Sequence, residues 1–173
     1  MFKKLLILSI FMSLISLTSQ AQQKFGHMNS GNIMELMPEV KLADAKLAVL
    51  DDSLGVVLDT MMAQFRHNYN TALKSVNEGT MSKLQQAEVE KQLNDDQTKI
   101  NDFQKMAQVM IGQRRQALLA PVINKLNTVI VEVGKENGYS FIFDVSSGSM
   151  LYVTESDDVS TLVAAKLGLT LPK

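Results

Sequence analysis

The stretch that decides the fold is VKLADAKLAVLDDSLGVVLDTM, residues 40–61. Its apolar residues recur at alternating steps of three and four, which is the a/d pattern of a helix that packs against another helix. This row consists of Val40, Ala43, Leu47, Leu50, Leu54, Val57 and Met61. Beyond Met61 the row loosens but continues through Phe65, Tyr69, Ala72 and Val76. We therefore expect one long helix from Glu39 to Asn77, with Pro38 at its start.

A second long helix follows after a short turn. The segment Asn77 to Thr80 has the composition of a turn between helices. Ser82, with Gln85 three residues later, fits a capping box that opens a helix. This helix should extend from about Lys83 to Asn137 and break only at Pro121. Its inner row is expected to consist of Ile100, Phe103, Ala107, Met110, Arg114 and Ala117.

The two helical segments between the prolines have nearly equal lengths. Glu39 to Asn77 contains 39 residues and Lys83 to Ala120 contains 38. At a rise of 1.5 Å per residue, each would be about 57 Å long. We expect an antiparallel helical hairpin, the arm, over residues 39–120, with its turn near residues 77–82. Pro38 and Pro121 are the expected hinges at its base.

The remaining residues, 22–38 and 121–173, are expected to form a small body. Three strands are predicted, of which the last two form a hairpin: Lys24–Met28, Tyr139–Val145 and Met150–Val153. A short helix should follow Pro121, and a final helix should begin at Asp157 or Asp158. The predicted fold class is α+β, mostly α, with three strands per chain and a long protruding helical hairpin.

This body carries more apolar surface than one small sheet and two short helices can cover. A domain with so little core usually completes itself by association. We therefore expect an oligomer that forms through the body, with the arms left free. The residues expected at the contact between chains are Phe25, Met28, Phe141, Phe143, Leu151 and Val153.

Composition argues against most enzyme chemistry. The 173 residues include no cysteine and two histidines, which excludes thiolate metal sites, iron–sulfur clusters and thiol nucleophiles. Asp51 and Asp52 are adjacent on a helix, as are Asp95 and Asp96, so their carboxylates diverge. His67 is expected to be solvated, and a net charge of -1 gives no pull toward nucleic acid. We expect no catalytic residue, metal site, cofactor or nucleic-acid partner.

The first 21 residues have the layout of a secretory signal peptide. Lys3 and Lys4 precede an apolar stretch from Leu5 to Leu17, and cleavage is expected after Ala21. A membrane anchor is the alternative, but the stretch is shorter than the roughly 20 apolar residues that span a bilayer. The mature chain carries 15 basic and 18 acidic groups, a net charge of -3. Export without any cysteine is typical of a protein of the bacterial periplasm.

Several segments, which together span the mature chain, resemble the Skp (OmpH-like) periplasmic chaperones. They are His27-Met28-Asn29, the helix opened by Pro38, Gly79 to Ser82, Leu118 to Val122, Glu136 to Tyr139, Phe143-Asp144 and Leu151-Tyr152. The resemblance implies a homotrimer joined through the bodies, whose three arms enclose a cavity for unfolded outer-membrane β-barrel proteins. Such chaperones are commonly basic, whereas this mature chain is acidic. We therefore assign no lipopolysaccharide site and leave peripheral membrane contact open.

The expected function is that of an ATP-independent periplasmic holdase that binds unfolded outer-membrane proteins. Flexible and aromatic side chains on the arm can contact many apolar sequences. The candidate client-binding residues are Met62, Phe65, Tyr69, Phe103 and Met106. Packing inside the hairpin is the alternative role for the arm methionines, and it fits Met61 and Met110 directly. The alternative function is a structural coiled-coil spacer or adaptor of the cell envelope.

Overall fold

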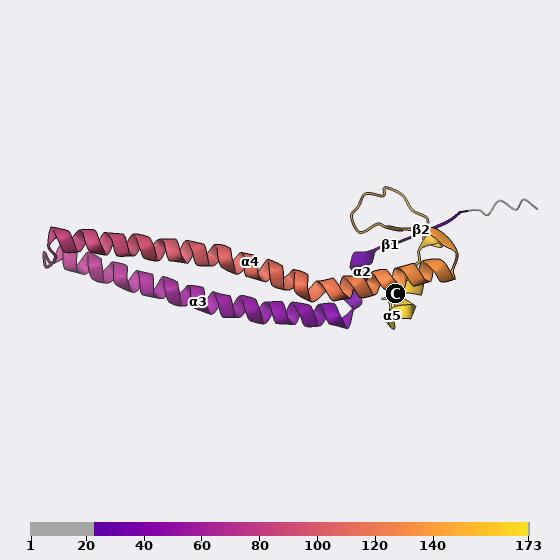
Figure 1. Ribbon diagram of the computed structural model, residues 1–173, viewed down its shortest axis with the longest axis horizontal. Helices are drawn as coiled ribbons and strands as arrows, with labels where there is room; N and C mark the ends of the chain where they lie inside the picture. Colours follow the sequence, from indigo (N-terminus) through magenta and orange to yellow (C-terminus); the bar gives the residue numbers. More distant parts are fainter. Residues whose placement is uncertain (1–22, 173) are drawn as a thin grey trace, which may run out of the picture.

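The computed structural model describes residues 23–172, which form a small body from which one long helical hairpin projects (Figure 1). The predicted signal peptide, with its cleavage site after Ala21, lies outside the described residues. Two strands, four α-helices and one short 3₁₀ helix follow one another along the described chain. In order they are β1 (Lys24–Met28), α2 (Ser30–Leu36), α3 (Pro38–Asn77), α4 (Lys83–Glu136), β2 (Tyr139–Asp144), η1 (Glu155–Asp157) and α5 (Ser160–Leu167).

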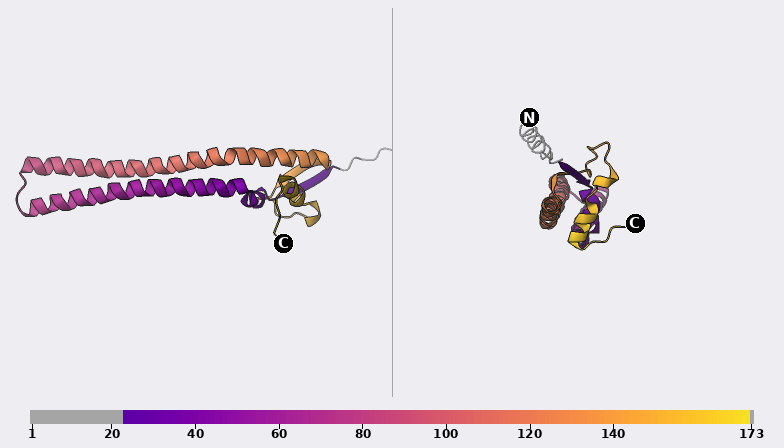
Figure 2. Two further views of the ribbon diagram at one scale, coloured as in Figure 1. Left: turned by 90° about the horizontal axis from the view of Figure 1, so that it is seen from below. Right: turned by 90° about the vertical axis from the view of Figure 1, so that its right-hand side faces the viewer.

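The arm agrees with the prediction from the apolar row. Helices α3 and α4 contain 40 and 54 residues and lie side by side in antiparallel directions in both side views (Figures 1 and 2). Pro38 occupies the first turn of α3, where its missing N–H costs no helical hydrogen bond. The chain reverses at Gly79, whose φ of 66° is readily available only to glycine.

The predicted capping box at the start of α4 is present. The backbone N–H of Gln85 donates to Ser82 Oγ at 3.3 Å, and the N–H of Ser82 donates to Gln85 Oε1 at 2.9 Å. Two N–H groups at the end of the helix, which would otherwise have no partner, are thereby satisfied. The sequence therefore located this helix start correctly.

The predicted break at Pro121 is not observed, because α4 continues through this residue as one helix. Pro121 lies on the exposed side of α4, so water can hydrate the carbonyl group that loses its partner. Before the proline, Leu118 is half-buried, and after it Val122 and Leu126 are 5% and 2% exposed. Packing on both sides of the proline holds it within one helix. Helix α4 thus belongs to the arm and to the body.

The contact row of the arm differs from the predicted row in its middle. In α3, Leu58 is half-buried whereas Val57 is 44% exposed, and in α4, Ile111 is half-buried whereas Met110 is 39% exposed. Arg114 is also exposed. The observed rows therefore step by three, four and four, which are Leu47, Leu50, Leu54 and Leu58 in α3 and Ile100, Phe103, Ala107 and Ile111 in α4. These three steps together span eleven residues. Such a spacing locally unwinds the left-handed supercoil that a regular heptad row produces.

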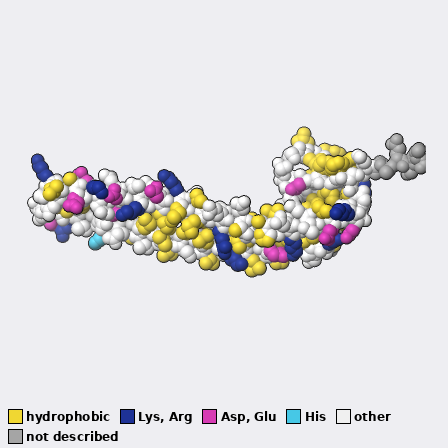
Figure 3. Space-filling model, in the orientation of Figure 1, with side chains coloured by type: hydrophobic (Ala, Val, Ile, Leu, Met, Phe, Trp, Pro, Cys, Tyr) yellow, Lys and Arg dark blue, Asp and Glu magenta, His cyan; other side chains and the backbone are white. Residues whose placement is uncertain are grey.

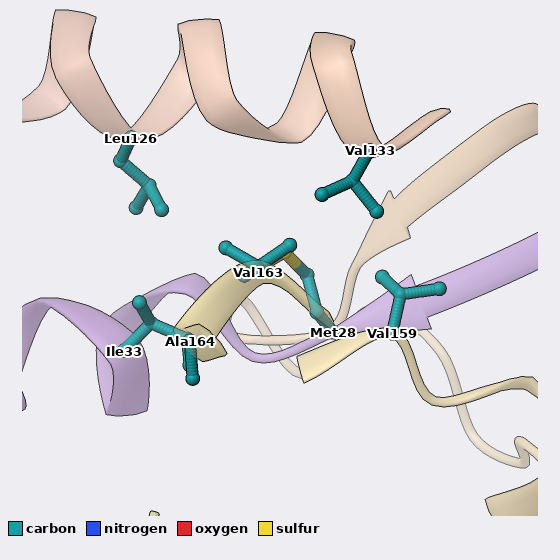
Figure 4. Packing of buried hydrophobic residues seen from close by; sticks show 7 residues of the cluster. All are labelled: Met28, Ile33, Leu126, Val133, Val159, Val163 and Ala164. Atoms are coloured by element: carbon teal, nitrogen blue, oxygen red, sulfur yellow. The ribbon is translucent and has the colours of Figure 1, made fainter. Parts of the chain in front are cut away.

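The body is built on a parallel pair of strands. Phe25 pairs with Phe141 and His27 with Phe143, and the crossover between the strands comprises α2, α3 and α4. One side of the pair packs against α4 and α5. The buried cluster on that side contains Met28, Ile33, Leu126, Val133, Val159, Val163 and Ala164 (Figure 4).

The predicted third strand, Met150–Val153, is wrong: within residues 23–172 the sheet has two strands. The carboxylate of Asp144 accepts hydrogen bonds from the N–H groups of Ser30 and Ser146, at 3.1 and 2.9 Å. Both bonds lie where β2 ends. Residues 145–154 form a loop instead of a returning strand.

Two further differences concern short elements. Helix α2 was not predicted, although Asn29 caps it by accepting the N–H of Asn32 at 3.0 Å. The final helix begins at Ser160, later than predicted, because residues 155–157 form the 3₁₀ turn η1. Asp158 still acts near this start, since its Oδ1 accepts the N–H of Ser160 at 2.7 Å.

Candidate interaction surfaces

The two sides of the arm can be distinguished by the grooves between its helices. Thr60 and Gln64 of α3 line one groove together with Lys99 of α4. Nearer the base, Leu42 of α3 and Ala117 of α4 line a second groove. This groove is on the same side of the arm, because Leu42 lies a whole number of helical turns from Thr60 and Ala117 lies a whole number of turns from Lys99. On the opposite side, a third groove opens beside Gly55, where α3 has no side chain. Its polar lining consists of Asp51, Asp52, Asp59, Gln104 and Gln108.

The first side carries exposed apolar residues along the base half of the arm. Val57 lies three residues before Thr60, and Met106 lies seven residues after Lys99, so both share its side. We call this set the apolar face; its members, which are 39% to 67% exposed, are Leu42, Val49, Val57, Met106, Val109 and Met110. Apolar side chains gather over the middle of the arm in the space-filling view (Figure 3).

The opposite side, which we call the acidic face, is defined by Asp51, Asp52, Asp59, Gln104 and Gln108. All five side chains are exposed. The two sides thus differ in most of their exposed groups, although Lys46 and Lys99 line the grooves of the first side and Val56 lines the groove of the second. Hydration favours leaving the acidic face in water, whereas contact with an apolar partner favours covering the apolar face.

The five predicted client-binding residues do not form one surface. Met62 and Tyr69 lie seven and fourteen residues after Gly55, which places them on the side of the acidic face, farther toward the tip. Phe65 and Phe103 are half-buried between the helices, where Phe65 lies beside Ile100. Met106 alone belongs to the apolar face and is 49% exposed.

Sequence reasoning missed most of the apolar face. Met110 was expected inside the hairpin, yet it is 39% exposed, while Met61 is half-buried in the contact row as the packing alternative proposed. A signal was present: Leu42 and Val49 lie seven residues apart outside the a/d row. Repeats of seven outside a packing row indicate a second apolar stripe on the helix.

A polar cluster lies inside the contact row toward the tip. Asp96 accepts hydrogen bonds from Gln92 at 2.8 Å, Lys99 at 3.3 Å and Asn68 of the facing helix at 3.4 Å. Burial alone would raise the pKa of Asp96, but the hydrogen bonds from Gln92 and Lys99 outweigh it and hold the pKa below its ordinary value. The tip half of the arm therefore packs through polar as well as apolar groups.

Ion pairs hold the arm and the last helix to the body end of α4. Lys125 of α4 bonds to Glu39 of α3, which lowers the pKa of Glu39. Lys166 of α5 bonds to Glu136 and to Glu132, and these hydrogen bonds raise the pKa of Lys166. The predicted hinges, Pro38 and Pro121, lie at the base of the arm. At this end the Lys125–Glu39 pair joins α3 to α4.

A second apolar surface lies on the body. Phe25, Phe141 and Phe143 are 46%, 55% and 42% exposed, and their ring centroids are 5.9 to 6.3 Å apart. We call these three rings the aromatic face. In the loop after β2, Leu151 and Tyr152 are also exposed, at 100% and 81%.

The remaining predicted contact residues behave differently from the aromatic face. Met28 is 1% exposed inside the buried cluster, so it offers no surface to a second chain, and this part of the prediction is wrong. Val153 is half-buried. The error at Met28 arises because α2 and α5 cover its side of the strand, and α2 was not foreseen.

The two histidines are not placed as metal ligands. His27 Nε2 lies 2.8 Å from the carbonyl oxygen of Thr154, which ties the loop after β2 to β1. His67 is exposed on α3. Within residues 23–172, no three metal-ligating side chains converge.

Comparison with known proteins gives two matches. The family model described as "Outer membrane protein (OmpH-like)" matches residues 24–167. A crystal structure of a protein from Caulobacter crescentus CB15, proposed to be an outer membrane chaperone (OmpH-like), superposes with a TM-score of 0.69 at 16% sequence identity. The match covers 90% of this chain and 92% of that one, and it establishes a shared fold. None of the curated proteins matches the chain.

Proposed function

Because the chain belongs to the OmpH-like family of outer membrane proteins, we propose that it is an ATP-independent holdase chaperone of the bacterial periplasm. Its clients are unfolded outer-membrane β-barrel proteins on their way across that compartment. The observation that carries this proposal is the apolar face, a set of exposed, uncharged side chains on a long projecting arm. Exposed apolar side chains that share one side of an element are often part of a site that binds other molecules.

The proposed assembly is a homotrimer joined through the bodies. The aromatic face and the exposed Leu151 and Tyr152 are the surfaces that a second chain would cover. In addition, α4 contains an 18-residue stretch with a mean hydropathy of 1.3, of which 17% is buried. Such an apolar helix is poorly covered by one chain, which supports association. In a trimer, three arms would project together and bound a cavity.

Holding without a nucleotide requires contacts that are individually weak. Strong contacts at a few positions would slow the release of the client, since affinity changes act mainly on dissociation rates. Methionine and valine side chains spread along an arm supply many small apolar contacts and no fixed hydrogen-bond pattern. This chemistry suits clients of unrelated sequence.

The proposal is tested by dilution of a urea-denatured β-barrel protein into buffer with the purified mature chain and no ATP. We expect suppressed light scattering and a soluble complex in sedimentation that contains both proteins. Aggregation at the same rate and extent as without the chain would refute the holdase function.

The alternative function, a structural spacer or adaptor of the cell envelope, has less support. A rigid spacer favours an unbroken apolar heptad row. In this arm the row changes its spacing at Leu58 and includes Asn68 and Asp96 toward the tip. These departures favour a compliant arm over a rigid one.

A further inference from the structure

We propose that three exposed methionines on the arm, Met62, Met106 and Met110, are oxidation sites through which hypohalous acids or peroxides reversibly switch off client holding. This inference rests on the proposed holdase function and adds its regulation by a chemical modification. The reacting atom is the sulfur of each side chain, and the product is methionine sulfoxide. The most buried methionines of the body are protected, so the chain stays folded while the arm changes its chemistry.

Methionine supplies all the sulfur of this protein. The sequence contains eleven methionines and no cysteine. Met1 and Met12 precede Ala21, which leaves nine in the predicted mature chain. Oxidants that react with sulfur therefore meet thioether groups and no thiol, and among thioethers the accessible ones react first.

The structure sorts these methionines by exposure. On the arm, Met62, Met106 and Met110 are 37%, 49% and 39% exposed, whereas Met28 and Met37 are each 1% exposed. An oxidant in solution reaches the first set directly and reaches the second set only when the fold opens. The other four are the half-buried Met34, Met61 and Met81, and Met150, which is 38% exposed in the loop after β2.

The three exposed arm methionines lie at nearly the same height. Met106 is followed by Ala107, which lines one groove together with Leu58 of α3. Met62 follows Leu58 by about one turn, and Met110 follows Met106 by about one turn. All three sulfur atoms are therefore carried by the middle of the arm, where apolar side chains gather in the space-filling view (Figure 3).

Oxidation transfers one oxygen atom to each sulfur. With hypochlorous acid, the sulfur loses two electrons, the chlorine gains them and leaves as chloride, and one proton is released. With hydrogen peroxide, the second product is water. A methionine sulfoxide reductase reverses the step, since two electrons and two protons remove the oxygen atom as water.

The sulfoxide changes what the arm offers to a client. Met106 and Met110 are two of the six residues of the apolar face, and their thioethers are apolar and flexible. A sulfoxide oxygen is a hydrogen-bond acceptor, so an apolar client segment that covers it must displace its water without replacing the lost hydrogen bond. Oxidation should therefore weaken holding.

The fold should survive the same treatment. The three arm side chains are already partly in water, so a polar group at their ends removes little buried packing. Met28 belongs to the buried cluster of the body, where a sulfoxide would disrupt the core, but its burial delays the reaction. Met37, directly before α3, is equally buried. The distribution of methionine thus separates the arm surface from the core.

The test compares two sets of leucine replacements, because leucine is apolar, similar in size to methionine and inert to these oxidants. The arm variant carries Met62→Leu, Met106→Leu and Met110→Leu. The matched control carries Met34→Leu, Met81→Leu and Met150→Leu and keeps the three proposed sites. Each protein is treated with hypochlorite, freed of excess oxidant and compared with its own untreated sample in the dilution assay with a urea-denatured β-barrel protein.

The expected result is a loss of holding that follows the arm sites. After treatment, the unmodified chain and the control variant should need at least about fivefold more protein for half-suppression of aggregation. The arm variant should need less than about twofold more than its own untreated sample. Methionine sulfoxide reductases of both stereospecificities should restore holding by the unmodified chain.

Peptide mass spectrometry and circular dichroism locate the modification and check the fold. Trypsin cleaves after Lys105 and Arg114, so one peptide carries both Met106 and Met110. This peptide should gain two oxygen atoms at hypochlorite amounts that leave Met28 and Met37 unmodified. Helical circular dichroism and sedimentation should not change at these amounts.

The outcomes separate the regulation from the function. If the untreated chain does not suppress aggregation, the holdase function fails. If the untreated chain holds its client and holds it equally well with the arm sulfoxides present, the proposed switch is overturned. Equal loss of holding by the arm variant, or no recovery after the sulfoxides are reduced, would assign the effect to damage elsewhere and also overturn it.

Discussion

Ser30 and Asp144 lie 114 residues apart in sequence, and the carboxylate of Asp144 accepts hydrogen bonds from both the backbone N–H and the hydroxyl group of Ser30. The contact joins the end of β2 to the start of α2. Asp144 accepts the N–H of Ser146 as well. One side chain thus connects the end of β2, the start of α2 and the beginning of the loop that follows β2.

Replacement Asp144→Asn should destabilise the body by about 1 kcal/mol, because the exposed carboxylate acts through charge-assisted hydrogen bonds that water partly screens. Burial alone would raise the pKa of Asp144, but its hydrogen bonds from Ser30 and Ser146 together lower it. A lowered folded-state pKa gives stability that is present above the unfolded value, about 3.9, and is lost as the pH falls through the folded value. Thermal unfolding from pH 7 to pH 2 should show the variant and the unmodified chain converging at the acid end.

A second prediction concerns the buried cluster. Ile33 of α2 is fully buried, so Ile33→Ala should cost about 2 to 4 kcal/mol through lost burial and the cavity left behind. Ile123→Ala is the matched control, because this side chain is 42% exposed on α4, and its cost should stay below about 1 kcal/mol. Urea denaturation measures both values. Equal costs would mean that α2 does not contribute to the core.

A third prediction tests association through the aromatic face. Phe141→Asp should abolish the oligomer while leaving the chain folded, because the ring is 55% exposed within one chain. An unpaired carboxylate buried between chains would cost several kcal/mol. Sedimentation should show monomers with unchanged helical content, and Thr161→Asp, on an exposed part of α5, should remain assembled. An intact oligomer of Phe141→Asp would place the interface elsewhere.

A fourth prediction concerns the proposed hinge. Pro121 lies inside α4 and on its exposed side, so Pro121→Ala restores a helical hydrogen bond without a loss of packing. We expect stabilisation by about 1 kcal/mol or more, seen as a higher midpoint of thermal unfolding. If flexing at the arm base serves the holding of clients, the variant should also hold large clients less well than the unmodified chain. Equal holding would leave Pro121 with a structural role only.

A fifth prediction concerns salt. The six residues of the apolar face are uncharged, and Lys46 and Lys99 are among the few charged residues in the grooves of its side, so the affinity for a denatured β-barrel protein should fall only slightly between low and physiological salt. Titration of a fluorescently labelled client at two ionic strengths measures the effect. A steep decrease in affinity would show that charged groups dominate client binding.

Sequence reasoning located the arm correctly because its signals are local. The row from Val40 to Leu54, the glycine turn at Gly79 and the capping pair Ser82 and Gln85 each act within a few residues. Helix α3 and the start of α4 therefore lie where they were predicted, whereas the predicted end of the arm at Pro121 is not the end of a helix. A periodic row over many turns is also the most reliable pattern that a sequence offers.

The errors occurred where distant contacts decide the structure. Residues 150–153 alternate in the manner of a strand, but they lie in a loop. The loop begins beside the contact of Asp144 with Ser30, and no sequence pattern reveals a contact across 114 residues. The client-binding set was scattered because aromatic and methionine residues were chosen by type. The side on which each one lies depends on the exact rotation of the two helices, which the change of spacing at Leu58 and Ile111 shifts.

That change of spacing affects the direction in which the arm presents its surfaces. A two-stranded coiled coil with a pitch of about 150 Å would rotate by roughly 140° over an arm of about 57 Å, and any stripe along it would wind around the axis. Leu54 and Leu58 face Ala107 and Ile111 at the same height, so both helices lose part of this rotation together. A given side of the hairpin therefore turns less around its axis over this stretch than it would in a regular heptad coil. Several arms placed around a common axis could then present the same side inward.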